Sequence, residues 1–196
     1  MGNKEAAIAE MKRLADYYPN DLNYKGMYGD ILLQNDKDDE ALRIYREILS
    51  EEPDNNRTQL SLRSYYKKLG ETAKADSMTM CVLLNKNTTN DAREYLMRQL
   101  ISEQGEENRD SIKVLSCFDA IQHSDCRSAD IGLLQVAYMN MLKMPEDSVV
   151  KVLENILDFA PDNASASLQL IGKAWEKDDM DRVLQLTSLS SQYNPD

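Results

Sequence analysis

The sequence has little of what interrupts a helix, and it has no long hydrophobic run. Its 196 residues include only 7 Gly and 5 Pro. Those two residues destabilise a helix interior most strongly, whereas Ala, Leu, Met, Glu and Lys, which are abundant here, favour helices over sheets. No stretch approaches the roughly 18 consecutive apolar residues of a membrane-spanning helix. The composition therefore favours an all-helical chain and argues against membrane insertion.

Basic residues are also scarce. The chain has 23 Lys and Arg against 34 Asp and Glu, which gives a net charge of −11. Nucleic acids and anionic membranes both require a basic face on the protein, so neither is expected as a main partner. Hydrophobic residues make up 42% of the sequence, which is enough to bury a core and too many for a disordered chain.

Cysteine is limited to Cys81, Cys117 and Cys126. An odd number of cysteines makes a poor disulfide framework, and we expect reduced thiols that are partly buried. A disulfide between Cys117 and Cys126 stays open if the protein is exported. A metal site would need a fourth ligand and a tighter cysteine pair, so no metal and no cofactor are expected.

The few prolines reveal an internal repeat. Pro19 and Pro53 are 34 residues apart, as are Pro161 and Pro195, and the 108 residues from Pro53 to Pro161 equal three such periods plus six. Each of these prolines is adjacent to Asn or Asp in a similar local string, which is typical of a chain that ends one helix and turns into the next. A fixed period of this length is the signature of a repeat architecture.

Two helical patterns fill one period. The segments 24–34 and 39–51 each carry apolar residues at the spacing of a single helical face, and the polar residues 35–38 separate them. The 34-residue unit resembles the tetratricopeptide repeat. Gly29 and Ala41 stand at its two small positions, Tyr45 holds the aromatic place, and Pro53 the terminal proline; Lys25 replaces the usual Trp.

The resemblance covers nearly the whole chain and implies an all-α, right-handed superhelical solenoid of antiparallel helix pairs. We expect a lone second helix at 5–21, then repeats at 22–55, 56–89, 90–129, 130–163 and 164–196, with a six-residue insertion around 104–110 in the third full repeat. Because the array starts with a second helix, we expect a segment of a longer protein. The compartment stays open between the cytoplasm and export, the latter if a signal peptide lies outside this sequence.

Members of the family hold a peptide or a helix on a concave face made by the first helices. Two groups of residues are expected there. One is basic, and its members are Arg57, Lys67, Lys68 and Arg98; the other is apolar, and its members are Leu134, Tyr138, Met141 and Trp175. The basic group would capture an acidic side chain or carboxylate, unless surface acids offset it. The apolar group would form an interface, unless it is buried against the next repeat or against the insertion.

Known carboxylate clamps of the family use Lys and Asn on successive first helices. Gly26 and Asp30 occupy the matching places in the first full repeat, and an Asp there is expected to repel a carboxylate. That clamp is therefore not expected in its usual form.

Catalysis is not expected. The one histidine, His123, would need Cys117 or Cys126 and an orienting third group to form a nucleophilic site, and the sequence indicates no such group. Glycine-rich phosphate loops are absent. The acidic runs at 36–40 and 177–181 lie in turns between helices and lack the spacing of a calcium loop.

The sequence thus predicts a non-catalytic protein–protein interaction module, a scaffold that binds a peptide or helix through shape and charge. The alternative is a structural repeat segment of a larger cell-envelope or multidomain protein, whose groove packs against its own chain. Self-association through the C-terminal repeat is a further expectation.

Overall fold

The computed structural model describes residues 2–103 and 111–193, which form two compact units, 1–88 and 89–196. The insertion predicted around 104–110 lies outside the described residues. Each unit is described by itself below.

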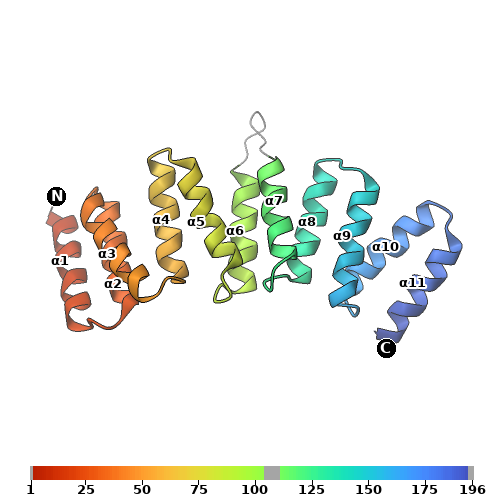
Figure 1. Cartoon of the computed structure of the whole chain (residues 1–196), viewed down its shortest axis with the longest axis horizontal. Coiled ribbons are helices and arrows are strands. Elements are labelled where there is room, and N and C mark those ends of the chain that lie inside the picture. The colour runs from red at the N-terminus through yellow and green to blue at the C-terminus, as the bar shows by residue number, and fades with distance from the viewer. Residues whose placement is uncertain (1, 104–110, 194–196) are drawn as a thin grey trace. The chain divides into compact units, whose positions relative to one another are not determined.

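Unit 1 contains five helices in the described residues. They are α1 (Gly2–Tyr17), α2 (Leu22–Gln34), α3 (Asp38–Glu51), α4 (Asn56–Lys68) and α5 (Thr72–Leu84). Helix α2 packs on α3 and α4 packs on α5, and short turns join the members of each pair (Figure 1). The second helix of the first pair, α3, also contacts α4, and the two first helices α2 and α4 touch each other.

Unit 2 contains six helices in the described residues. They are α6 (Asn90–Ser102), α7 (Ser111–Gln122), α8 (Ala129–Met141), α9 (Glu146–Phe159), α10 (Ala164–Glu176) and α11 (Met180–Tyr193). The same order of contacts recurs: α8 packs on α9, α9 on α10, and α10 on α11, while the first helices α6 and α8 touch. The all-α architecture of consecutive helix pairs is thus confirmed. No helix in the part of the chain described here has the length and apolarity to cross a membrane.

Polar side chains fix where each first helix begins. Their side-chain oxygens accept hydrogen bonds from backbone N–H groups of the first turn, at Asp21, Asn55, Thr89, Ser128 and Asn163. Such N-caps satisfy donors that a helix otherwise leaves unpaired. The intervals along the sequence between successive N-caps are 34, 34, 39 and 35 residues. The repeat that was expected to have 34 residues from 130 therefore starts one residue early and is one residue longer.

The extra residue lies in the turn between α8 and α9. In the first repeat, Asp36 has a left-handed φ of 60° and one residue, Lys37, follows it before α3 begins. In the turn after α8, Lys143 has a φ of 54°, and two residues, Met144 and Pro145, precede α9. Because one residue turns a helix by about 100°, counting from the prolines shifts the register of α8 by one residue.

Each unit has its own core. In unit 1, Leu32, Ala41, Tyr45 and Leu62 form a buried cluster. The small position predicted at Gly29 is confirmed there, since a Cβ on Gly29 would lie 2.7 Å from Cε1 of the fully buried Tyr45. In unit 2 the buried cluster joins α8 to α11 and includes Val136, Leu153, Ile156, Leu170 and Leu186.

Candidate partner-binding surface

The first helices of each unit share one surface, which we call the first-helix face. Its central position is the ninth residue after each N-cap, which holds Asp30 and Ser64 in unit 1 and Arg98, Ala137 and Gly172 in unit 2. Counting from the prolines instead gives Tyr138 as the counterpart of Asp30, which is wrong by one residue. The two units fill this face with different chemistry.

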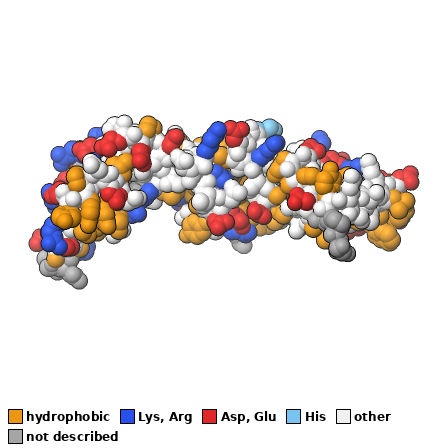
Figure 2. Space-filling view, turned by 90° about the horizontal axis from the view of Figure 1, so that it is seen from below, with side chains coloured by type: hydrophobic (Ala, Val, Ile, Leu, Met, Phe, Trp, Pro, Cys, Tyr) orange, Lys and Arg blue, Asp and Glu red, His pale blue; other side chains and the backbone are white. Residues whose placement is uncertain are grey.

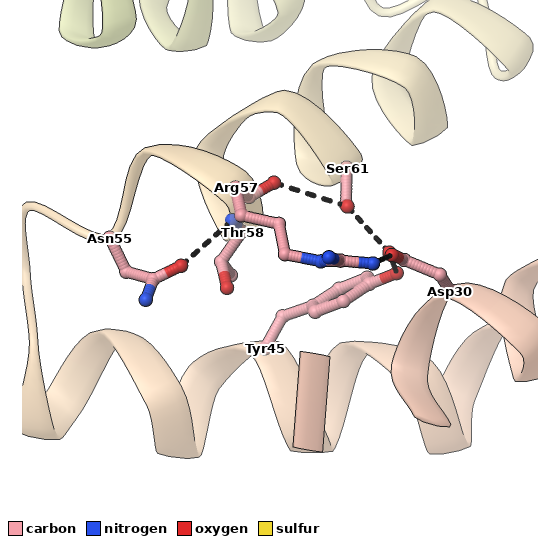
Figure 3. Close-up of polar contacts among 6 residues, drawn as sticks. All are labelled: Asp30, Tyr45, Asn55, Arg57, Thr58 and Ser61. Atoms are coloured by element: carbon pink, nitrogen blue, oxygen red, sulfur yellow. Dashed lines mark hydrogen bonds and ion pairs between the residues drawn. The ribbon is translucent and has the colours of Figure 1, made fainter. Parts of the chain in front are cut away.

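In unit 1, Asp30 is the acceptor of a compact polar network (Figure 3). The Tyr45 hydroxyl donates to Asp30 Oδ1 at 2.9 Å, and the Ser61 hydroxyl donates to the same oxygen at 2.6 Å. Arg57 Nη2 of the next first helix donates to Asp30 Oδ2 at 2.8 Å. The network therefore joins α2, α3 and α4 through one carboxylate.

This network changes how the charges of Asp30 and Arg57 act. Burial and the Asp30 carboxylate raise the pKa of Tyr45, so the hydroxyl keeps its proton and remains a donor. The Arg57 guanidinium offsets the charge of Asp30, which weakens the expected repulsion of a carboxylate. Arg57 itself is already paired, which agrees with the alternative in which acids offset the basic group.

Lys68 is also paired with acids. Its Nζ lies 2.7 Å from Asp36 Oδ1 and 3.8 Å from Asp38 Oδ1. The hydrogen bond lowers the pKa of Asp36 and raises the pKa of Lys68. Lys67 is exposed on α4. Because Arg57 and Lys68 each pair with an acid, the alternative in which surface acids offset these cations describes them better. Figure 2 shows acidic and basic side chains interspersed over the face it presents.

In unit 2 the first-helix face contains a groove between α6 and α8. It has a volume of about 260 Å³ and is lined by Arg98, Ile101 and Ser102 of α6 and by Leu134, Ala137, Tyr138 and Met141 of α8. The lining thus brings together four of the predicted residues, namely Arg98, Leu134, Tyr138 and Met141.

Within this groove the predicted apolar residues have unequal roles. Leu134 is 8% exposed and Tyr138 3% exposed, so they form the floor rather than an exposed patch. Tyr138 packs on Phe118 of α7, with ring centroids 6.1 Å apart. Met141 is 51% exposed and lies at the rim. Ala137, which sequence counting missed, is exposed at the central position, and its small side chain leaves room above the floor.

Arg98 is the one charged residue among those lining the groove. Its Nε and Nη2 both donate to Glu94 Oε1, at 2.8 and 2.6 Å, from the preceding turn of α6. In unit 1 the corresponding bond, from Arg57 to Asp30, crosses between two helices. In unit 2 the two matching positions hold Arg98 and Asp130, and the described residues show no bond between them.

Trp175 and its neighbours lie apart from the groove lining. Trp175 is 62% exposed on α10, Leu168 of the same helix 67%, and Leu184 of α11 69%. The exposure predicted for Trp175 is therefore present, and we refer to these three exposed residues of adjacent helices as the α10–α11 patch.

A second hollow was not indicated by the sequence. It has a volume of about 590 Å³ and lies at the turns of unit 1, beside Tyr17, Tyr18, Asp21, Glu52 and Asn55. The Tyr18 ring stacks on Tyr24 with centroids 5.1 Å apart. The sequence gives little sign of this hollow, because the spacing of its tyrosines is that of ordinary residues at the end of a helix.

Cys81, Cys117 and Cys126 are thiols in the structure and are not joined by disulfides, with Cys117 and Cys126 buried and Cys81 exposed. His123 is exposed, and its Nδ1 lies 2.8 Å from the Asp119 carbonyl oxygen. Within the described ranges, no group of three His, Cys, Asp or Glu side chains is placed to hold a metal ion.

Comparison with known proteins assigns no relative: no family model matches the chain, and no curated protein matches it.

Proposed function

We propose that this chain is a non-catalytic interaction module of the tetratricopeptide type, and that the groove between α6 and α8 binds a peptide or a helix of another protein. The N-cap spacings of 34 and the close approach of Gly29 to Tyr45 support the family assignment. The groove itself is the observation that carries the binding proposal.

The size of the groove favours a side-chain anchor over a free small molecule. Pockets that enclose a drug-sized ligand measure about 300–1,000 Å³, whereas this groove measures about 260 Å³ and is open on one side. Its floor of Leu134 and Tyr138 is packed by the core beneath, so the groove is formed before a partner arrives. A preformed apolar groove reduces the ordering cost of binding.

Met141 makes the rim adaptable. A methionine side chain is unbranched and polarisable, so it can adjust to anchors of different shape. An amphipathic helix would insert one apolar residue above Ala137 and rest its neighbouring turns on α6 and α8. The protein contributes shape and charge selection, and no bond is made or broken.

The test is to block the groove. A random peptide library displayed on phage would be panned on the purified protein, and the recovered peptides measured by fluorescence anisotropy against Ala137→Trp. The matched control is Ala73→Trp, which places the same side chain on an exposed position of α5. We expect Ala137→Trp to abolish binding and Ala73→Trp to leave it unchanged. Equal binding to both variants would show that the groove is not the site.

The α10–α11 patch favours a second candidate, packing of this face against its own chain or a second copy. Three large apolar side chains are more than 60% exposed on these two adjacent helices, and a second surface that covered them would bury apolar area. Light scattering on the purified chain, repeated with Trp175→Ala, tests it. A dimer that the substitution dissolves supports the second candidate, and a monomer in both cases leaves the groove as the one candidate interface.

A further inference from the structure

We infer that the segment bound in the groove carries a carboxylate beside its apolar anchor, and that this carboxylate replaces Glu94 as the partner of Arg98. The inference rests on the proposed function, because it concerns the same groove. It adds that the partner carries a negative charge, and that Glu94 competes with the partner for Arg98.

The geometry of the Arg98–Glu94 pair leaves part of both groups unused. Nε and Nη2 of Arg98 share one oxygen, Glu94 Oε1, so Nη1 of Arg98 and Oε2 of Glu94 take no part in the contact. The Arg98 side chain is 61% exposed although it lines the groove. A carboxylate that enters the groove with an apolar anchor therefore meets a guanidinium that is accessible from solvent.

The Arg98–Glu94 pair is also of the kind that exchanges easily. Exposed pairs four residues apart on one helix contribute only about 0.3–0.5 kcal/mol, because water screens them and both side chains lose freedom. Arg57 in unit 1 differs, since it bonds to a carboxylate on another helix that also accepts from Tyr45 and Ser61. Of these two arginines, Arg98 is the one free to change partner.

The surroundings favour a carboxylate over other ligand groups. The planar fork of an arginine matches the two oxygens of a carboxylate and binds them more strongly than it binds neutral acceptors. The rest of the lining is apolar apart from Ser102, so a bound anchor would exclude water and strengthen the pair. The net charge of −11 repels acidic segments at long range, so any preference for an acidic partner must come from local contacts such as Arg98.

Two biased display libraries test the inference on the full chain. Both fix a large apolar residue in a helical peptide; one places Glu or Asp three or four positions away, and the other places Lys or Arg there. We expect the acidic library to yield binders that Ala137→Trp abolishes. We expect Arg98→Glu to reverse the preference, so that the basic library yields the binders.

Variants of the pair then separate its two members. For an acidic binder, Arg98→Gln should weaken binding about tenfold, as expected for the loss of a charge-assisted hydrogen bond. Glu94→Gln should strengthen binding about two- to fivefold, because it removes the competitor while keeping helix propensity. Lys151→Gln, which removes an exposed cation from α9, is the control and should leave the affinity unchanged.

The outcomes distinguish this inference from the proposed function. Groove-dependent binders that come from the basic library, or that ignore Arg98→Gln, would overturn the inference while the binding groove stands. Weaker binding in Glu94→Gln would also overturn it, since Glu94 would then support the site rather than compete. If neither library yields a binder that Ala137→Trp abolishes, the proposed function fails as well.

Discussion

The residue nine positions after the N-cap makes different contacts in the two units. In unit 1 this position holds Asp30, whose carboxylate accepts hydrogen bonds from three donors on two other helices. In unit 2 this position holds Arg98, which is paired only within its own helix, and Ala137, whose small side chain lines the groove. A position that stabilises contacts between helices in one unit is open to a partner in the other.

The comparison shows how a repeat separates stability from binding. Stacked repeats contact mainly their neighbours, so each position can be changed without altering the rest of the array. In unit 1 the polar network takes the place of a binding surface. In unit 2 the buried residues Leu134 and Tyr138 pack beneath the groove, and the exposed position above them is where the proposed partner would bind.

Removal of the Asp30 carboxylate is the largest expected effect. Asp30→Ala leaves the buried Tyr45 hydroxyl and the Arg57 guanidinium without an acceptor, and we expect unit 1 to lose about 3 kcal/mol. Ala137→Ser, at the matching position of unit 2, should change the free energy of unfolding little. Hydrogen exchange by mass spectrometry would locate the loss. Equal loss of protection in both units after Asp30→Ala would contradict the contrast drawn between them.

A methyl group at Gly29 should cost somewhat less. Its Cβ would lie 2.7 Å from the Tyr45 ring, so the ring must shift, and overpacking of this kind costs about 2 kcal/mol. The control is Gly172→Ala in unit 2, where a Cβ meets nothing within 4 Å and the gain in helix propensity should stabilise the protein by up to about 1 kcal/mol. Urea unfolding followed by circular dichroism measures both. Similar midpoints for the two variants would mean that the α2–α3 contact is looser than described.

Much of this arrangement follows from the sequence, and the part that does not has a physical cause. The phase of Pro19 and Pro53 with the polar strings around them predicts the helix pairs, and the small size of Gly29 predicts its contact. The central position of α8 was predicted one residue late, at Tyr138 instead of Ala137, because the turn before α9 is one residue longer. One extra residue in a turn does not change the apolar spacing within either flanking helix, so periodicity alone does not detect that residue.

The sequence also did not predict which partner each charged side chain bonds to. The sequence predicted Arg57 and Arg98 as members of one basic group, yet Arg57 bonds to a carboxylate of the preceding first helix and Arg98 bonds within its own helix. The difference depends on which residue of the neighbouring first helix faces each arginine, and therefore on three-dimensional register. Ala137 was missed for the same reason, since a small exposed residue has no signature until its neighbours are known.

Alkaline pH should weaken unit 1 selectively. The pKa of Tyr45 is raised in the folded protein, whereas a tyrosine in the unfolded chain titrates near 10. Below pH 10 both states hold the proton and the stabilisation is complete; above it the unfolded chain releases its proton first, so stability falls by up to about 1.4 kcal/mol per pH unit. Urea unfolding at rising pH should show a smaller decline in Tyr45→Phe. The control Tyr95→Phe, at an exposed tyrosine of α6, should decline like the wild type, and an equal effect of both substitutions would contradict the assignment.

The smallest effect is expected at Lys68, and it tests what makes the Asp30 network different. The Lys68–Asp36 pair, at 2.7 Å, is as short as the 2.8 Å bond from Arg57 to Asp30, whereas Asp38 lies 3.8 Å from Lys68. Lys68 and Asp36 are both exposed, so screening and side-chain entropy cancel most of their attraction. Lys68→Gln should therefore leave the urea midpoint unchanged, whereas Arg57→Gln should lower it because Asp30 loses its cation beside a buried phenol. If Lys68→Gln destabilises unit 1 as much as Arg57→Gln, net charge rather than the geometry of the network governs this face, and the acidic partner inferred for Arg98 would need the same reconsideration.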